Sequence, residues 1–419
     1  MNGVNLNVIP TTKFKNTSIT VDFIEPVNHD RFADLSIVAE MMESSNQKYP
    51  QQSLLAKQLS RLYGAGFGTD VLRYGQLHIL RLVISFPNEQ YLPTNESTFK
   101  MAIDFLRAVI FQPLAEAGAF NAMTFELQKQ NTINYVKSIP DDKQFYSVLQ
   151  LRKLYYHDDP NYSGLVYGTL DQLQAVTPQS AYQAYQEMLN HSQIQISVLG
   201  NVNEATVKDE INQIGFTSRA EHEYPVKVPV KVESEVARRV EHQDLNQSKL
   251  DLAYSLPIFY DSDQRFAALL FNAIFGGTPQ SKLFRNVREK NSLAYYADSV
   301  FSSITGMLMV QTGISSEDHA KVVQIVNDQL TAIQNGDFDA DTIENIKADI
   351  VNSKLAGLDS QRQLLNEQLV NNLLNQHFTT DEWCAKVKAV SKQAIVDVAK
   401  QVRLRAIYFL DGRDEDDSE

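Results

Sequence analysis

Two periodicities alternate along this chain, and together they predict strands and helices. Apolar and polar residues alternate in residues 18–24 and 250–254, as in strands with one buried face. Nearly continuous apolar runs at residues 79–85 and 306–311 predict more deeply buried strands. Helical spacing of apolar residues occurs at Leu55, Leu59 and Leu62, and again at Val322, Ile325, Val326, Leu330 and Ile333. Strands and helices interleaved in this way predict an α+β fold, with helices packed on mostly antiparallel sheets.

The sequence also repeats itself. Four short segments recur in the same order in the two halves: Arg31–Leu35 as Arg265–Leu269, Gln52–Leu55 as Gln280–Leu283, Phe120–Glu126 as Phe338–Glu344, and Ile194–Gly200 as Ala406–Gly412. Chance could supply one such match but hardly four in the same order. The chain is therefore predicted to contain two tandem copies of one unit of about 200 residues.

The junction between the two copies is visible in the composition. Residues 218–240 contain two prolines and dense charge, and valines alternate with Lys or Glu. This pattern is typical of an extended linker that leads into an edge strand. We therefore predict an N-terminal domain at 1–217, a linker with the first strand of the next domain at 218–240, and a C-terminal domain at 241–419.

Composition narrows the class of protein. With 43% hydrophobic residues in 419, the chain can bury sizeable cores. A net charge of −13 argues against a nucleic-acid partner, because phosphate binding depends on clustered Lys and Arg. No apolar run is long enough to span a membrane, and no basic segment followed by an apolar run begins the chain. The single Cys384 allows no internal disulfide, which fits a reducing compartment. We therefore expect a cytoplasmic protein.

The histidines do not form a compact zinc motif. A hydrolytic zinc site on a helix uses two histidines close together with an acid between them. The chain has eight histidines, and no two lie within four residues of each other. A site assembled from scattered residues is the remaining way for this chain to hold a catalytic metal.

A segment of the second half resembles a known substrate-binding motif. Residues 275–296 read FGGTPQSKLFRNVREKNSLAYY. They resemble the substrate-gripping motif of the pitrilysin/insulinase-type zinc peptidases, and look closest to the bacterial YmfF-like members. The resemblance implies that Arg288 and Tyr295 hydrogen-bond the substrate backbone. The guanidinium offers several fixed donors, and the phenol can polarise a carbonyl or hold the oxyanion that develops from it. From spacing alone, the alternative is a basic, solvated helix face.

The metal-binding motif of that family is degenerate in the first half. Residues 30–50 resemble the helix and turn that carry the family's inverted His-x-x-Glu-His motif. Counting along this resemblance puts the two ligand positions at Ser36 and Glu40 and the general base at Ala39. A serine and an alanine are unsuitable, and one glutamate would bind a metal only weakly.

The third ligand of the family is a glutamate on a later helix. The best match to that helix, residues 128–135, contains none, although Glu116 and Glu126 just upstream remain as shifted alternatives. The resemblance thus implies no catalytic residue and no metal in this chain. It also implies two homologous domains with the LuxS/mitochondrial-processing-peptidase-like metallohydrolase fold.

Three functions are compatible with this pattern. In two-chain members of the family, one chain carries the metal and the other the Arg/Tyr pair, and this sequence resembles the second kind. The first expectation is therefore a non-catalytic, substrate-binding subunit that binds peptides in a chamber and pairs with a zinc-bearing homologous subunit or with itself. The alternatives are a stand-alone peptide-binding or scaffold protein and, less favoured, an active metallopeptidase with an unrecognised site.

Overall fold

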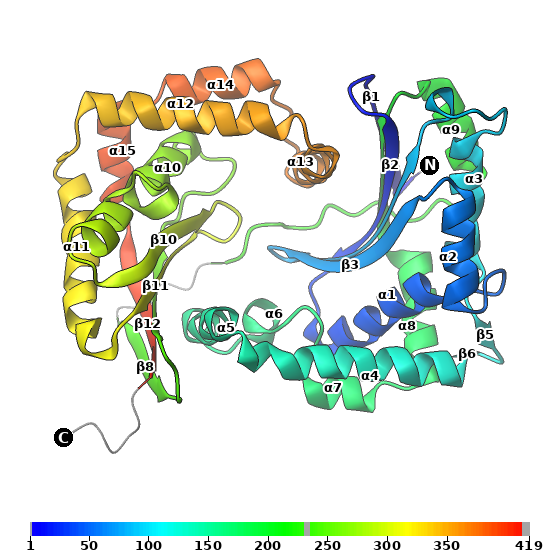
Figure 1. Cartoon of the computed structure of the whole chain (residues 1–419), viewed down its shortest axis with the longest axis horizontal. Helices are drawn as coiled ribbons and strands as arrows, with labels where there is room; N and C mark the ends of the chain where they lie inside the picture. Colours follow the sequence, from blue (N-terminus) through cyan, green and yellow to red (C-terminus); the bar gives the residue numbers. More distant parts are fainter. Residues whose placement is uncertain (1, 230–234, 413–419) are drawn as a thin grey trace. The chain divides into compact units, whose positions relative to one another are not determined.

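The computed structural model describes residues 2–229 and 235–412. Those residues form two compact units (Figure 1). Among the described residues, the first unit comprises 2–138, 165–226 and 357–376, and the second comprises 139–164, 227–229, 235–356 and 377–412. Each unit thus includes one short segment from the opposite half of the sequence. The predicted α+β fold with two mostly antiparallel sheets is confirmed.

The first unit is built on a five-stranded sheet of order β1-β7-β2-β4-β3. Its strands are β1 (Val4–Pro10), β2 (Asn16–Pro26), β3 (Gly66–Tyr74), β4 (Leu77–Pro87) and β7 (Gln193–Gly200). β1 pairs with β7 in parallel and the other pairs are antiparallel. The strands predicted at 18–24 and 79–85 lie within β2 and β4 and are confirmed.

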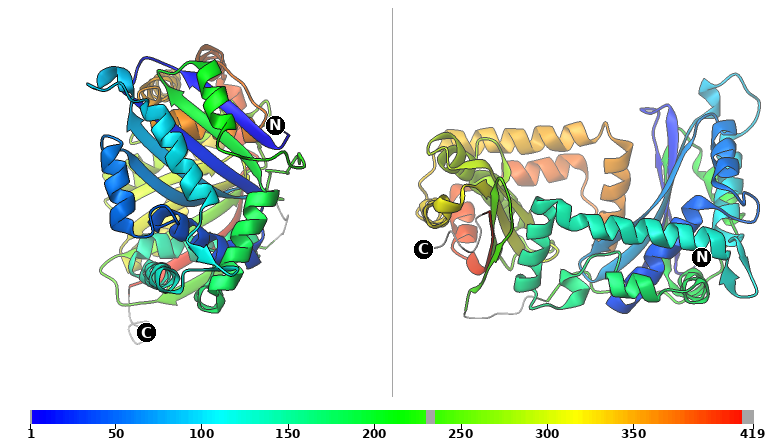
Figure 2. Two further views of the ribbon diagram at one scale, coloured as in Figure 1. Left: turned by 90° about the vertical axis from the view of Figure 1, so that its right-hand side faces the viewer. Right: turned by 60° about the horizontal axis from the view of Figure 1, so that its bottom comes forward.

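The alternation along β2 gives this sheet two different faces. Ile19, Val21 and Phe23 belong to its apolar face, which packs against the main helical layer (Figure 2). That layer contains α1 (Phe32–Ser44), α2 (Gln52–Arg61), α3 (Thr98–Phe111), α4 (Ala122–Ser138), α7 (Leu170–Ala175), α8 (Pro178–His191) and α9 (Glu204–Asn212), with the short strands β5 (Ala115–Glu116) and β6 (Ala119–Phe120). The opposite, more polar face carries Asp22 and lies under the single helix α13 (Gln361–Leu373), which comes from the second half of the sequence.

The second unit repeats this topology. Its sheet has the order β10-β11-β9-β12-β8, so each strand has a counterpart in the first sheet. The strands are β8 (Ala237–His242), β9 (Ser248–Ser255), β10 (Ala294–Ser302), β11 (Met307–Ile314) and β12 (Arg403–Asp411). β8 and β12 are parallel, as β1 and β7 are. The predicted strand 250–254 is confirmed within β9, and the one predicted from Gly306 begins at Met307.

Helices also cover both faces of the second sheet. The larger core lies against α10 (Arg265–Asn272), α11 (His319–Gln334), α12 (Ala340–Gly357), α14 (Thr380–Lys388) and α15 (Lys392–Ala399). The opposite face packs against α5 (Lys143–Tyr155), which is followed by α6 (Pro160–Ser163), through a smaller cluster that includes Leu151, Tyr155 and Tyr408. The helix predicted at 322–333 is confirmed within α11.

The matching topologies show that the recurring sequence segments mark a repeated structural unit. The limits of 1–217, 218–240 and 241–419 stay a prediction, and residues 230–234 of the predicted linker lie outside the described residues. Among the helices that the structure describes, none is long and apolar enough to cross a membrane.

Candidate functional site

The expected metal-binding helix forms, but its side chains are engaged in packing. Ser36 on α1 is 2% exposed, and its hydroxyl donates to the carbonyl oxygens of Phe32 at 2.8 Å and Val166 at 3.4 Å. This i→i−4 bond ties the hydroxyl to its own helix. Ala39 is also buried, and its methyl group cannot accept a proton. The Ser36 hydroxyl is thus bonded to backbone carbonyls, and Ala39 has no polar atom in its side chain.

Glu40 is the only acid among the three expected positions. It is half-buried, and its pKa is raised by burial and by the nearby carboxylate of Glu43. Glu43 is held by β3, since its Oε2 accepts from the backbone N of Thr69 at 2.7 Å and from its hydroxyl at 2.9 Å. A raised pKa means that Glu40 carries its charge less readily, which weakens it further as a lone metal ligand.

The residues expected to carry the third ligand are helical. Residues 128–135 belong to α4, which packs against α1. Gln128 is buried and its Oε1 accepts from the side-chain amide of Asn131 at 3.2 Å, while Tyr135 packs edge-on against Tyr167 at 5.1 Å. Within residues 2–229 and 235–412, no group of three His, Cys, Asp or Glu side chains could hold a metal ion.

The sequence interpretation did not single out His78, which lies beside α1. Its ring stacks on Phe32 at 4.5 Å, and burial lowers its pKa to about 4. The carbonyl of Val166 accepts a hydrogen bond from His78 as well as from Ser36. The alternation of β4, which places His78 on the apolar face with Leu80 and Leu82, is the signal that predicts a buried imidazole here.

The second candidate site lies in the second unit, where Arg288 and Tyr295 stand on consecutive elements. Arg288 belongs to the wide helical turn Phe284–Glu289, with its guanidinium 4.8 Å from the ring centre of Phe284. Buried Leu283 and Val287 anchor this turn. The Arg288 side chain itself is exposed, so its donors face solvent.

Tyr295 is placed by a β-bulge at the start of the edge strand β10. The pairing with β11 shifts register between Ala294 and Tyr296, so Tyr295 has no partner residue across the ladder. Ser292 just before it has φ of 53°, and its backbone N donates to the carbonyl of Arg288 at 3.1 Å. Bulges re-aim side chains, and Tyr295 is 78% exposed.

The glycine pair at the start of the motif has a structural reason. A Cβ on Gly276 would lie 2.7 Å from the backbone N of Ser299, on β10. A Cβ on Gly277 would lie 3.0 Å from the carbonyl oxygen of Asn272. Only glycine lets the end of this helix approach β10 so closely. The Phe275-Gly-Gly motif therefore shapes the support on which Arg288 and Tyr295 stand.

Comparison with known proteins finds similar sequences and structures along nearly the whole chain. Residues 175–350 match the family model described as the peptidase M16 inactive domain. The probable inactive metalloprotease YmfF of Bacillus subtilis (strain 168) is 28% identical over 98% of this chain and 96% of its own. The chain is thus similar to M16 peptidases. The predicted resemblance to the pitrilysin/insulinase-type peptidases is thereby confirmed.

Solved structures extend the likeness across both units. A conserved protein from Enterococcus faecalis V583 is 37% identical, with a TM-score of 0.94 over 99% of this chain and 98% of that one. A peptidase M16 inactive domain from Pseudomonas fluorescens, at 14% identity, superposes with a TM-score of 0.80 over 98% of this chain and 95% of that one. The likeness in fold to M16 structures therefore extends along nearly the whole chain. The roles of Ser36, Ala39, Glu40, Arg288 and Tyr295 stay predictions.

Proposed function

We propose that this M16-like chain is the non-catalytic, substrate-binding subunit of a two-chain zinc metallopeptidase. It would bind peptides in a chamber and supply Arg288 and Tyr295, while a homologous subunit supplies the zinc ion. The observation that carries this proposal is the contrast between the two sites. Ser36 and Ala39, at the expected catalytic positions, are buried, and the Ser36 hydroxyl is bonded to its own helix. Arg288 and Tyr295, by contrast, are exposed to solvent.

The chain's own residues support binding rather than hydrolysis. A zinc peptidase lowers the pKa of a metal-bound water to make its nucleophile, and Ser36, Ala39 and Glu40 offer neither a full ligand set nor a base. The B. subtilis relative is described as a probable inactive metalloprotease, which agrees with this interpretation.

Arg288 and Tyr295 suit a peptide backbone. A guanidinium offers five N–H donors in a fixed plane, and a phenol can donate to a carbonyl oxygen or to the oxyanion that forms from it. Neither group needs a metal in its own chain to do this. In a complete complex both would stabilise substrate and transition state next to the partner's zinc ion.

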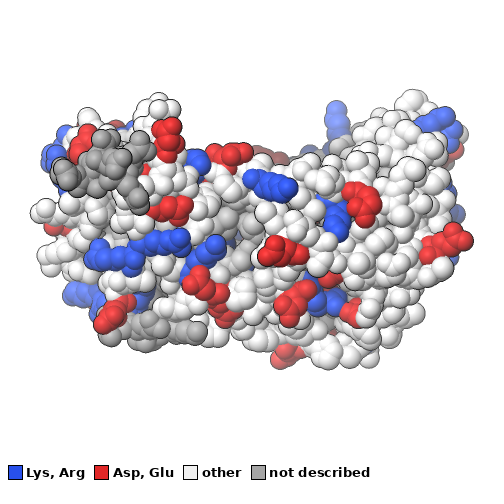
Figure 3. Space-filling model, turned by 90° about the horizontal axis from the view of Figure 1, so that it is seen from below, with Lys and Arg blue, Asp and Glu red and all other residues white. Residues whose placement is uncertain are grey.

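The surface charge supports a protein or peptide partner over nucleic acid. On the face shown in Figure 3, Lys and Arg side chains are interspersed with Asp and Glu, and the chain as a whole has a net charge of −13. Nucleic-acid binding calls for concentrated positive charge. Because the chain has a single cysteine, we propose that the complex is cytoplasmic, without a membrane partner.

The test is co-expression with an M16 homologue from the same host that carries the inverted His-x-x-Glu-His motif. We expect the two chains to co-elute in size-exclusion chromatography and to cleave a quenched fluorescent peptide library in a chelator-sensitive way. Peptide binding by the lone chain, without pairing, would favour the stand-alone scaffold. Chelator-sensitive cleavage by the lone chain would overturn the proposal.

A further inference from the structure

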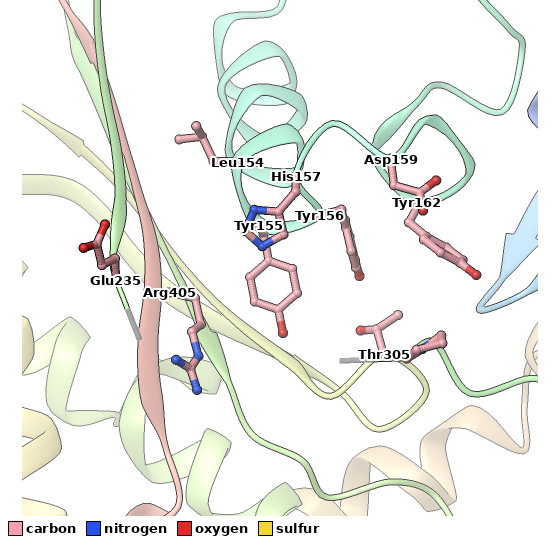
Figure 4. Close-up of a pocket in the computed structure, with 10 residues that line it drawn as sticks. Leu154, Tyr155, Tyr156, His157, Asp159, Tyr162, Glu235, Thr305 and Arg405 are labelled. Atoms are coloured by element: carbon pink, nitrogen blue, oxygen red, sulfur yellow. The ribbon is translucent and has the colours of Figure 1, made fainter. Parts of the chain in front are cut away.

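A cavity of about 210 Å³ lies within the second unit, at the C-terminal end of α5 (Figure 4). Its walls come from the end of α5 and the residues after it, from Pro229 and Glu235, from the turn between β10 and β11, and from β12. Neither Arg288 nor Tyr295 is among the lining residues. The cavity therefore calls for an explanation separate from the proposed substrate-binding pair.

Three tyrosines form an aromatic wall of this cavity. Tyr155 and Tyr156 meet edge to face, with ring centres 5.0 Å apart, and Tyr156 and Tyr162 lie 5.7 Å apart. Leu154 adds an aliphatic surface. Such a wall favours another ring, because aromatic groups pack well edge to face or offset.

One polar atom in the wall is unused by the protein. The hydroxyl of Tyr155 is buried and has no hydrogen-bond partner within the described residues. By contrast, Tyr156 bonds with the hydroxyl of Thr305, and Nε of Arg405 donates to Ser255 Oγ at 2.9 Å. Figure 4 shows the Tyr155 hydroxyl pointing toward the space between Arg405 and Thr305. A buried unpaired hydroxyl is destabilising, and a ligand atom that bonded to this one would remove that cost.

Size and charge restrict the ligand. A cavity of roughly 150 Å³ is enough to hold benzene, whereas pockets for drug-sized ligands start at about 300 Å³. The present volume of about 210 Å³ suits one substituted ring or one fused pair. The lining carries both signs of charge, with Arg405 opposed by Asp159 and Glu235, which favours a neutral molecule.

We propose that this cavity binds a small, neutral aromatic molecule with one hydrogen-bonding substituent, of the phenol or indole class. The ring lies against Tyr155, Tyr156 and Tyr162, and the substituent pairs with the Tyr155 hydroxyl. The site adds a small-molecule binding function to the chain and does not depend on peptide binding.

The proposal is tested with two probes that differ only in the hydroxyl group. 4-Fluorophenol and fluorobenzene are titrated with the full chain and followed by 19F NMR. We expect saturable binding of both at one site per chain. Tyr155→Phe should weaken the binding of 4-fluorophenol by about tenfold, which corresponds to ~1.4 kcal/mol. It should leave the affinity for fluorobenzene unchanged. Because this variant removes an unpaired polar atom, its melting temperature should not fall.

Tyr146→Phe is the matched control. Tyr146 lies on the same helix outside the cavity, and its hydroxyl donates to Glu241 Oε1 at 2.8 Å. It should leave both probes unchanged. A second variant, Thr305→Trp, places a large side chain in the cavity from the β10–β11 turn and should abolish the binding of both probes. Lack of saturable binding, equal weakening of the two probes by Tyr155→Phe, or full binding by a folded Thr305→Trp protein would overturn the proposal.

Discussion

Arg81 and Gln311 occupy corresponding positions in the two sheets, and each lies between two aspartates. Arg81 on β4 is opposite Asp22 on β2 and Asp70 on β3. Gln311 on β11 is opposite Asp251 on β9 and Asp298 on β10. The first sheet thus has a cation between its two acids and the second has a neutral amide. The two repeats therefore share a backbone plan but differ in the electrostatics of the sheet face that α13 covers in the first unit and α5 covers in the second.

Replacing Arg81 should be strongly destabilising. Its Nε donates to Asp22 Oδ1 at 2.5 Å and its Nη2 to Oδ2 at 3.2 Å, and Nη1 reaches Asn366 on α13. Arg81→Gln would leave the buried Asp22 charge unpaired, so we expect a loss of about 3–5 kcal/mol in the free energy of unfolding at pH 7. Urea denaturation measures it. The loss should shrink at low pH, where Asp22 becomes protonated.

The control for this experiment is an exposed ion pair in the same unit. Lys13 pairs with Asp359, and both side chains are largely exposed. Lys13→Gln should change stability by no more than ~1 kcal/mol. Similar losses for Lys13→Gln and Arg81→Gln would show that the buried pair has no special weight.

Asp251 should make the protein less stable as the pH rises. Burial, together with Asp298, raises its pKa to about 7, against the opposing effects of a hydrogen bond from Ser147 and the charge of Lys249. The native state therefore binds a proton that the unfolded chain releases above about pH 4. Between pH 4 and 7 this group makes the free energy of unfolding fall with rising pH, by at most about 1.4 kcal/mol per pH unit.

Asp251→Asn tests this through the slope rather than the absolute stability. Denaturation at several pH values should show a flatter pH dependence between pH 4 and 7 than in the unaltered protein. Asp209→Asn, at an exposed position on α9, is the control and should keep the original slope. An unchanged slope in Asp251→Asn would mean that Asp251 is ionised throughout.

The chain purified without added metal should contain no stoichiometric zinc. Ser36 and Ala39 provide no ligand or base, and the pKa of Glu40 is raised. Chelator should then leave the melting temperature unchanged, because no metal stabilises the native state. Elemental analysis and thermal melts with and without chelator measure this. One zinc per chain, with a chelator-dependent melt, would point to the site of scattered residues that the sequence left open.

Arg288→Ala and Tyr295→Phe should affect peptides and not folding. Both side chains are exposed, so their loss should change stability by no more than about 0.5 kcal/mol. Each should weaken peptide binding by roughly 1–3 kcal/mol, the range for a hydrogen bond to a charged or buried group. Fluorescence titration of a labelled peptide, with parallel thermal melts, separates the two effects.

Matched controls exist for both variants. Arg285 is exposed on the same helical turn, and Tyr91 is an exposed tyrosine of the first unit. Arg285→Ala and Tyr91→Phe should leave peptide affinity unchanged. Equal effects of Arg285→Ala and Arg288→Ala would support the alternative of a basic, solvated helix face.

The sequence predicted the sheets better than the helices that cover them. Alternation in residues 18–24 and 250–254 identified two central strands, since a half-buried strand shows its period directly. It could not reveal that α5 packs on the second sheet and α13 on the first, because periodicity shows that a segment is helical and not which surface it covers. The contacts of Ser147 with Asp251 and of Asn366 with Arg81 join residues more than a hundred positions apart.

The bulge that exposes Tyr295 could not be predicted from the sequence pattern either, since it depends on how the preceding helix end meets β10.

Gly276→Ala should directly disturb the contact between this helix end and β10, which supports Arg288 and Tyr295. The added methyl group would lie 2.7 Å from the backbone N and 2.8 Å from Cβ of Ser299, so the helix end or β10 must move. We expect a loss of about 1–3 kcal/mol in unfolding free energy, as for an overpacked core. Peptide affinity should fall as well, because the support under Arg288 and Tyr295 shifts. Gly66→Ala, where no atom lies within 4 Å of the added Cβ, should leave both quantities nearly unchanged. Denaturation and peptide titration of the two variants measure this, and a Gly276→Ala protein with unaltered stability and affinity would show that the close approach to β10 is dispensable.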